Sequence, residues 1–148
     1  MSYTNLFYHI VFSTKNRRPF LSDDVLLRAC QYMGGITRKL KSQLLLANGV
    51  SDHVHLATMV HPTIAIAEFI GKVKSNSSGW IHDTFADLRD FDWQDGYAGF
   101  TVSPSVMPKV KQYIRSQPEH HKKVSFQEEL IALLKKHGVE YDEKYICA

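Results

Sequence analysis

Two histidines one residue apart, in the stretch "SDHVHLATMV" (51–60), are the side chains best suited to chemistry. The surrounding residues are apolar and partly β-branched, which favours a β-strand. Side chains at i and i+2 of a strand point to the same face, so His53 and His55 should project side by side. Val54 and Leu56 should then fill the opposite face. Paired imidazoles are common ligands of divalent cations, and the alternative is one hydrogen-bonded core histidine beside one exposed histidine.

A tyrosine and a glutamine form a second group, in the stretch "QYIRSQ" (112–117). Tyr113 and Gln117 are four residues apart, so on a helix they share a face, with Cβ atoms roughly 6 Å apart. This spacing alone is also common on half-exposed helices. Combined with two imidazoles, an amide oxygen would give a divalent ion three neutral ligands and leave its full charge to polarise a phosphodiester. A tyrosine one turn away could then attack the phosphorus once its proton is removed.

The two groups together resemble the single-tyrosine HUH transposases of insertion sequences of the 200/605 type. HUH denotes histidine, a bulky apolar residue and histidine, which here are His53, Val54 and His55. The resemblance extends over nearly the whole chain, through "YHIVFSTKNRRPF", "KSNSSGW" and "WQDGYAGFTVS" to the tyrosine helix. It implies that His53, His55 and Gln117 hold Mg²⁺ or Mn²⁺. It also implies that Tyr113 attacks single-stranded DNA with hairpin ends, giving a 5′-phosphotyrosine bond and a free 3′-OH.

Two other functions remain open beside strand transfer. A domesticated relative would bind hairpin DNA without cleaving it, although the intact residues of both groups argue against this. A metal phosphohydrolase would use water and would need no tyrosine; the His-x-His-x-Asp pattern of metallo-β-lactamases is broken here by Ala57. A phosphotyrosine keeps the energy of the phosphodiester, so a second 3′-OH can rejoin the DNA without ATP. We therefore expect no nucleotide cofactor.

Basic residues are spread along the chain in a way that suits phosphate contacts. Each short group alone is more often a solvated face than a DNA-binding patch, and the formal charge of +3 is only a mild indication of a polyanionic partner. The expected DNA-binding residues are Lys15, Arg17, Arg18, Lys72, Lys74, Lys109 and Arg115.

The patterns predict four strands and four helices in the order β-α-β-β-α-β-α-α. Strands are expected at 4–14, 42–50, 53–60 and 96–103, and the first should be central because it is apolar on both faces. Helices are expected from Ser22, from Thr63, over 105–117 and from Ser125, where Glu128 has capping-box spacing. This order predicts an α+β, ferredoxin-like single domain over 1–148, with a mostly antiparallel sheet and helices on one face.

Composition and assembly complete the expectations. A chain of 148 residues with 44% hydrophobic residues can bury one core, and its 2 cysteines are too few for a disulfide framework. Neither a membrane-spanning run nor a signal peptide is present, so we expect a cytoplasmic protein. Strand transfer must hold two DNA ends, and a sheet covered on one side leaves an exposed face. Both favour a homodimer, and the family resemblance implies that its active sites can be composite, with the tyrosine helix delivered to the partner.

Overall fold

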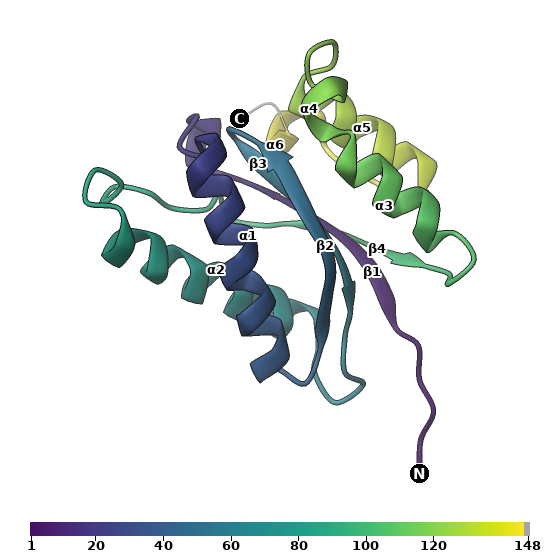
Figure 1. The fold of residues 1–148 in the computed structure, drawn as a ribbon. Helices are drawn as coiled ribbons and strands as arrows, with labels where there is room; N and C mark the ends of the chain where they lie inside the picture. Colours follow the sequence, from purple (N-terminus) through teal and green to yellow (C-terminus); the bar gives the residue numbers. More distant parts are fainter. Residues whose placement is uncertain (147–148) are drawn as a thin grey trace.

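A four-stranded antiparallel sheet organises residues 1–146, the part of the chain that this computed structural model describes (Figure 1). The strand order is β2-β3-β1-β4. The strands are β1 (Phe7–Ser13), β2 (Gln43–Val50), β3 (His53–Met59) and β4 (Ala98–Val102). The helices are η1 (Lys15–Arg17), α1 (Asp23–Lys39), α2 (Ile66–Thr84), α3 (Met107–Arg115), α4 (Gln117–His120), α5 (Phe126–Lys136) and α6 (Glu143–Ile146). The predicted α+β, ferredoxin-like class is therefore confirmed.

The first strand is central, as its apolar character predicts. β1 pairs with β3 on one side and with β4 on the other, both antiparallel. Successive side chains of β1 point to opposite faces of the sheet. Ile10 and Phe12 belong to the core under α1 and α2, whereas His9 and Val11 point to the other face. Burial on both faces explains why this strand has few polar residues.

The hairpin between β2 and β3 forms at the polar turn of Ser51 and Asp52, as expected. Gly49 lies opposite Val54 in this hairpin, and a Cβ on Gly49 would stand only 2.1 Å from the His53 carbonyl oxygen. Glycine therefore lets the two strands approach beside the first histidine, and any other residue would move the strand that carries it.

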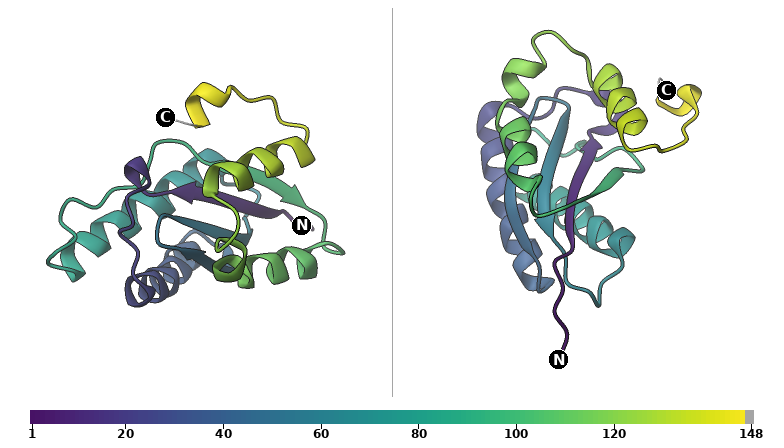
Figure 2. Two further views of the ribbon diagram at one scale, coloured as in Figure 1. Left: turned by 90° about the horizontal axis from the view of Figure 1, so that it is seen from above. Right: turned by 90° about the vertical axis from the view of Figure 1, so that its right-hand side faces the viewer.

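Helices cover both faces of the sheet, not one as expected. Helices α1 and α2 lie on one face, and α3, α4 and α5 lie on the other (Figures 1 and 2). The second layer is explained by apolar residues on the other face of the strands: Val11 and Phe100 pack with Leu133 and Leu134 of α5. A separate cluster of Ala57, Val102, Met107 and Ile114 fixes α3. The expectation of an uncovered sheet face, which was one of two arguments for a homodimer, is therefore wrong.

The predicted helix over 105–117 is divided in two. Helix α3 ends at Arg115, and Ser116 separates it from α4 with φ −87° and ψ 5°. Pro118 explains the break, because it has no N–H to donate to the Ile114 carbonyl one turn earlier. That carbonyl instead accepts a hydrogen bond from the Asn48 side-chain amide, at 3.2 Å.

The other predicted elements differ in their ends. α2 begins at Ile66 rather than at Thr63 and runs unbroken through its serines and asparagine. α5 begins after Ser125, whose hydroxyl accepts a hydrogen bond from the Glu128 amide at 3.2 Å. Among the described residues, no helix is long and apolar enough to cross a bilayer.

Candidate functional site

Strand β3 turns His53 and His55 toward the face covered by α3, α4 and α5. Both side chains are fully buried, and their rings lie 5.2 Å apart. Alternation along β3 sends Val54 and Leu56 into the core under α1 and α2. The pair thus lies under the second helical layer, and the expected alternative of one exposed histidine is wrong.

A third histidine joins this pair from the loop after α4. The Nε2 atom of His121 lies close to the same point as the β3 histidines, and its ring centre is 4.4 Å from that of His53. Only 8% of its side chain is exposed. The His121 side chain is therefore largely buried within the site.

Each of the three imidazoles has a partner for its Nδ1 atom. His53 Nδ1 lies 2.8 Å from the Asp52 carboxylate, and His121 Nδ1 lies 2.7 Å from the Val124 carbonyl. His55 Nδ1 lies 2.8 Å from His9 Nε2. Such outer partners orient a ring and present its Nε2 atom inward, as in metal sites. His9 therefore positions the His55 ring.

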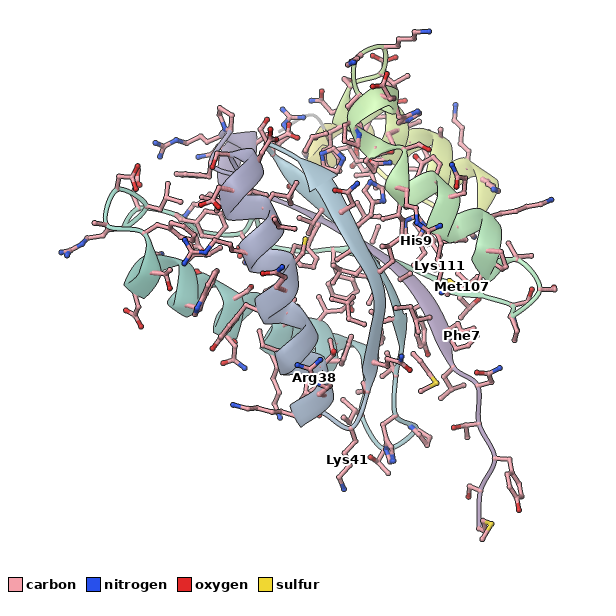
Figure 3. All side chains as sticks on the ribbon, viewed as in Figure 1. Phe7, His9, Arg38, Lys41, Met107 and Lys111 are labelled. Atoms are coloured by element: carbon pink, nitrogen blue, oxygen red, sulfur yellow. The ribbon has the colours of Figure 1, made fainter. Side chains whose placement is uncertain are left out.

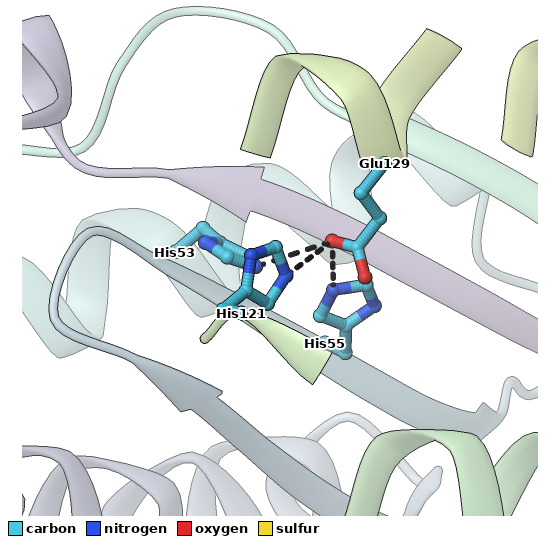
Figure 4. A group of neighbouring side chains, drawn as sticks. All are labelled: His53, His55, His121 and Glu129. Carbon is cyan, nitrogen blue, oxygen red and sulfur yellow. Dashed lines mark hydrogen bonds and ion pairs between the residues drawn. The ribbon is translucent and has the colours of Figure 1, made fainter. Parts of the chain in front are cut away.

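A glutamate from α5 lies at the centre of the cluster, with only 2% of its surface exposed (Figure 4). The Oε1 atom of Glu129 is 2.9 Å from His55 Nε2, 3.0 Å from His121 Nε2 and 3.2 Å from His53 Nε2. Its Oε2 atom accepts hydrogen bonds from the Tyr113 hydroxyl and, at 2.8 Å, from the Gln117 amide. One carboxylate therefore connects the histidines to the predicted nucleophile.

The four residues predicted from the two motifs thus come together in one chain. Tyr113 leaves α3 toward His55, with ring centres 5.7 Å apart. Gln117, at the first position of α4, is fully buried, and its Oε1 atom lies 3.2 Å from His53 Nε2. The break at Ser116 does not separate them, because both side chains reach the Glu129 carboxylate.

The electrostatics follow from burial and from this carboxylate. Burial alone would raise the pKa of Glu129, but hydrogen bonds from His53 and His55 outweigh it and hold the pKa far below its usual range. Burial and the hydrogen bond to Glu129 both raise the pKa of Tyr113, so the phenol is protonated. Burial also lowers the pKa of His9 to about 3, with a smaller contribution from His55.

The donor set fits a divalent cation. One ligand atom from each of His53, His55, His121 and Glu129 lies within 4.8 Å of all the others. The His121 Nε2 atom is buried and, despite its 3.0 Å approach to Glu129, makes no hydrogen bond of acceptable geometry. Buried polar atoms are normally paired, so this nitrogen fits a metal ligand.

The motifs did not reveal Glu129 and His121. Glu129 did carry a signal, because it lies three residues after Phe126 and four before Leu133 on the apolar face of α5. A charged residue in such a stripe is almost never fully buried without partners. The capping box at Ser125 and Glu128 hides this signal, since acidic residues are ordinary in a first helical turn.

A cavity of about 430 Å³ opens beside the tyrosine, between β4, α3 and the end of α5. Tyr113 and His9 line it together with Lys109 and Lys136. His9 lies on β1 beneath α3, with Lys111 and Met107 on the helix above it (Figure 3). The cavity therefore provides a positively charged approach to the Tyr113 side chain.

The other expected DNA-binding residues lie at several places. Arg17 lines a second cavity with Asp52 and His121, whereas Arg18 pairs with Asp90 at 3.0 Å. Lys15 and Arg115 are exposed, on η1 and α3.

Two of the expected lysines lie on α2, on the far face of the sheet. Lys72 pairs with Glu68 at 3.1 Å. The Nζ atom of Lys74 donates to the carbonyls of Gln94 and Gly96, at 2.6 and 2.8 Å. A DNA contact by Lys74 would therefore compete with bonds that hold this loop.

Curated relatives of the chain are transposases. The transposase for insertion sequence element IS200 of Salmonella typhimurium strain LT2 is 32% identical over 128 residues, which are 80% of this chain and 80% of that protein. The ISDra2 transposase TnpA of Deinococcus radiodurans is 25% identical over 115 residues, covering 74% of this chain and 82% of the relative.

Solved structures and a family model agree with these relatives. A crystal structure described as a candidate transposase from Deinococcus radiodurans R1 matches with a TM-score of 0.66 and 26% identity, over 78% of this chain and 93% of that one. A REP-associated tyrosine transposase bound to a REP hairpin shares the fold, with a TM-score of 0.61 and 13% identity over 84% of this chain and 73% of that one. The family described as "Transposase IS200 like" matches residues 2–117. The chain therefore belongs to the IS200-like transposase family.

Proposed function

We propose that this transposase cleaves and rejoins single-stranded DNA through a covalent bond between Tyr113 and a 5′-phosphate. The observation that carries the proposal is the convergence of Tyr113, Gln117 and the β3 histidines on one buried carboxylate. His53, His55 and Gln117 would hold Mg²⁺ or Mn²⁺. Such an ion supplies Lewis-acid polarisation of the phosphodiester and offsets the charge of a phenolate.

The chain's own residues account for the nucleophile. The Tyr113 oxygen attacks the phosphorus, an O–P bond forms, and the bond from phosphorus to the 3′-oxygen breaks. The proton of Tyr113 points at Glu129 Oε2, which is the atom placed to take it. The 3′-oxygen leaves and takes up a proton as a free 3′-OH. In the reverse reaction a second 3′-OH displaces Tyr113, so bond energy is conserved without a nucleotide cofactor.

Substrate DNA would approach through the cavity beside Tyr113. Lys109 and Lys136 line it and would contact phosphates, which position DNA without reading its sequence. The remaining predicted DNA-binding residues, Lys15, Arg17, Arg18, Lys72, Lys74 and Arg115, would contact DNA outside this cavity. Binding of hairpin DNA is part of the proposal, and it is supported by the fold shared with a transposase bound to a REP hairpin.

The proposed active site includes residues that lie C-terminal to the region matched by the family. The match ends at residue 117, yet α5 contributes Glu129 to the centre of the site. We also propose a homodimer, because two DNA ends need two tyrosines and each chain supplies one at this site. One chain already brings Tyr113 beside its own histidines, so this assembly needs no tyrosine helix from the partner.

The decisive experiment is a search for the covalent adduct. Labelled single-stranded hairpin DNAs are incubated with the protein and Mn²⁺ and then separated in SDS. We expect a labelled, SDS-resistant adduct from the wild type and from Tyr32→Phe, whose tyrosine is on α1 across the sheet. Tyr113→Phe should give none, while hairpin binding stays within a few-fold, because phosphate contacts come from basic residues.

The same assay separates the two alternatives. Cleavage that is unaffected by Tyr113→Phe and leaves no adduct would indicate a phosphohydrolase that uses water. Hairpin binding without cleavage or adduct would indicate a non-catalytic relative.

A further inference from the structure

The β3 histidines are not the only donors directed at the centre of the site. His121 comes from the loop after α4 and Glu129 from α5, and both lie beyond the region that matches the family. Glu129 Oε1 lies 3.2 Å from His53 Nε2 and 2.9 Å from His55 Nε2, and the ring centre of His121 is nearer to that of His53 than the ring centre of His55 is, at 4.4 against 5.2 Å. The C-terminal part of the chain therefore adds an imidazole and a carboxylate to the strand pair.

Hydrogen bonding fixes which nitrogen faces inward. A carboxylate and a backbone carbonyl can only accept, so Asp52 and Val124 require a proton on Nδ1 of His53 and His121. In the neutral imidazoles the Nε2 lone pairs then face Glu129 Oε1, which is also electron-rich. In the metal-free protein a proton on Nε2 of His53 or His55 can bond it to the carboxylate, and a bound cation would take the place of these protons.

The spacing of the donors matches a four-ligand ion. The Glu129 Oε1 atom is 2.9, 3.0 and 3.2 Å from the Nε2 atoms of His55, His121 and His53. A tetrahedron with its centre about 2.0–2.1 Å from each donor has edges of roughly 3.3–3.4 Å. The observed distances from Oε1 are about 0.1–0.5 Å shorter than these edges, so a small outward shift of the Glu129 carboxylate would make room for the ion.

We infer that His121 and Glu129 are metal ligands together with His53 and His55, and that this set of three imidazoles and a carboxylate binds a transition-metal ion in preference to Mg²⁺. Magnesium prefers oxygen ligands and keeps several waters, whereas imidazoles suit zinc and its neighbours in the first transition row. The inference rests on the proposed function for the place of the ion and revises two of its parts. His121 and Glu129 take the place of Gln117 as ligands, while the Gln117 amide bonds Glu129 Oε2, and Mg²⁺ gives way to a transition metal such as Mn²⁺ or Zn²⁺.

The ligand set also connects the metal to the nucleophile. Glu129 would bind the ion through Oε1 while Oε2 accepts the hydrogen bonds of Tyr113 and Gln117. Docking of α5 and filling of the metal site would then favour each other, because both require Glu129 in this position.

The test is calorimetric titration of the full-length, DNA-free protein with Zn²⁺ alone and with Mg²⁺ alone. We expect Zn²⁺ to bind at one site and Mg²⁺ to bind at least roughly a hundredfold more weakly. Glu129→Gln and His121→Asn should each weaken Zn²⁺ binding roughly tenfold or more. Circular dichroism confirms that each variant is folded, and Glu129→Asp, which keeps the charge on a shorter side chain, should lie between wild type and Glu129→Gln.

Two variants serve as matched controls, and both should bind Zn²⁺ like the wild type. Glu128→Gln changes the exposed residue next to Glu129. The Glu128 carboxylate accepts a hydrogen bond from the Ser125 hydroxyl and lies outside the cluster. His61→Asn changes a histidine that is bonded to Thr63, beyond the end of β3.

Wild-type affinity in both Glu129→Gln and His121→Asn, with binding lost in His53→Asn, would overturn the extended ligand set. Equal affinity for Mg²⁺ and Zn²⁺ would overturn the selectivity, and absence of any Zn²⁺ binding would overturn the inference as a whole. The adduct assay reports separately on the proposed function. An adduct with normal metal dependence but no effect of Glu129 or His121 on Zn²⁺ would refute only this inference.

Discussion

At the scale of single residues, His9 combines deep burial with a hydrogen bond to a predicted ligand. Only 3% of its surface is exposed, and the pKa of about 3 means that the folded protein keeps it neutral at pH 5, where an unfolded chain protonates it. Between pH 3 and 6.5 the unfolded state therefore binds more protons, so stability rises with pH in this range. His9 thus makes the protein sensitive to mild acid.

The pH dependence gives a direct prediction for His9→Gln. Lowering the pH from 7 to 5 should cost the metal-free wild type about 2 kcal/mol more of unfolding free energy than it costs the variant, in which position 9 does not titrate. Urea unfolding in EDTA at both pH values measures this difference. Parallel losses in both proteins would contradict a neutral, buried His9.

Sequence patterns identify residues whose spacing is local. His53 and His55 follow from alternation in one strand, and Tyr113 and Gln117 follow from one helical turn. Glu129 is 74 residues from His55, and no local period relates them. The position of Glu129 depends on how α5 packs against the sheet. The sequence patterns therefore predict the histidine pair and the Tyr113–Gln117 pair but not the carboxylate between them.

At the scale of elements, α5 is the helix on which the proposed metal site depends. It carries Glu129, and Leu133 and Leu134 anchor it to Val11 and Phe100. The order of strands and helices could be predicted because each has its own period and caps. The face that α5 covers could not, because it depends on small apolar clusters made by residues far apart in the chain.

Truncation of Leu134, which packs α5 against the sheet, should destabilise the docking of α5 without destabilising α1 and α2. Removal of a buried leucine side chain costs about 2–5 kcal/mol, so we expect Leu134→Ala to accelerate amide hydrogen exchange over 126–136 while α1 and α2 keep their protection. Mass-spectrometric exchange measures both regions in the same sample. Leu27→Ala is the control, because Leu27 is 60% exposed on α1.

Either of two outcomes would contradict this view of α5. Unchanged exchange in α5 of the Leu134→Ala protein would mean that the leucine is not its anchor. An equal rise in α1 and α2 would mean that α5 unfolds only together with the whole domain.

At the scale of the whole molecule, one face of the sheet carries the main apolar core and the other carries the polar site. The face under α1 and α2 carries the larger apolar core, with residues such as Phe12, Met33 and Phe69. The opposite face has two small apolar clusters with the polar site between them. Stability and chemistry are therefore separated by one layer of strands, so substitutions at the site leave the main core in place.

Whether a site is built from one chain or two can be decided by mixing inactive proteins. Tyr113→Phe removes the nucleophile and His53→Ala removes a predicted ligand, so each protein alone should form no adduct. In the present structure Tyr113 lies beside the histidines of its own chain, and Met107 and Ile114 hold α3 to that chain's sheet. Each site of a mixed dimer would then keep one defect, and we expect no adduct after subunit exchange.

Composite sites predict the opposite result from the same mixture. One site of each mixed dimer would carry both defects and the other neither, so isolated mixed dimers would recover about half of the wild-type sites. Two distinguishable affinity tags isolate the mixed dimers before the assay, and wild type mixed with Tyr113→Phe shows that exchange does not itself inactivate the protein. Recovery near a half would show that α3 crosses to the partner when DNA binds, and a protein that stays monomeric on hairpin DNA would refute the proposed dimer.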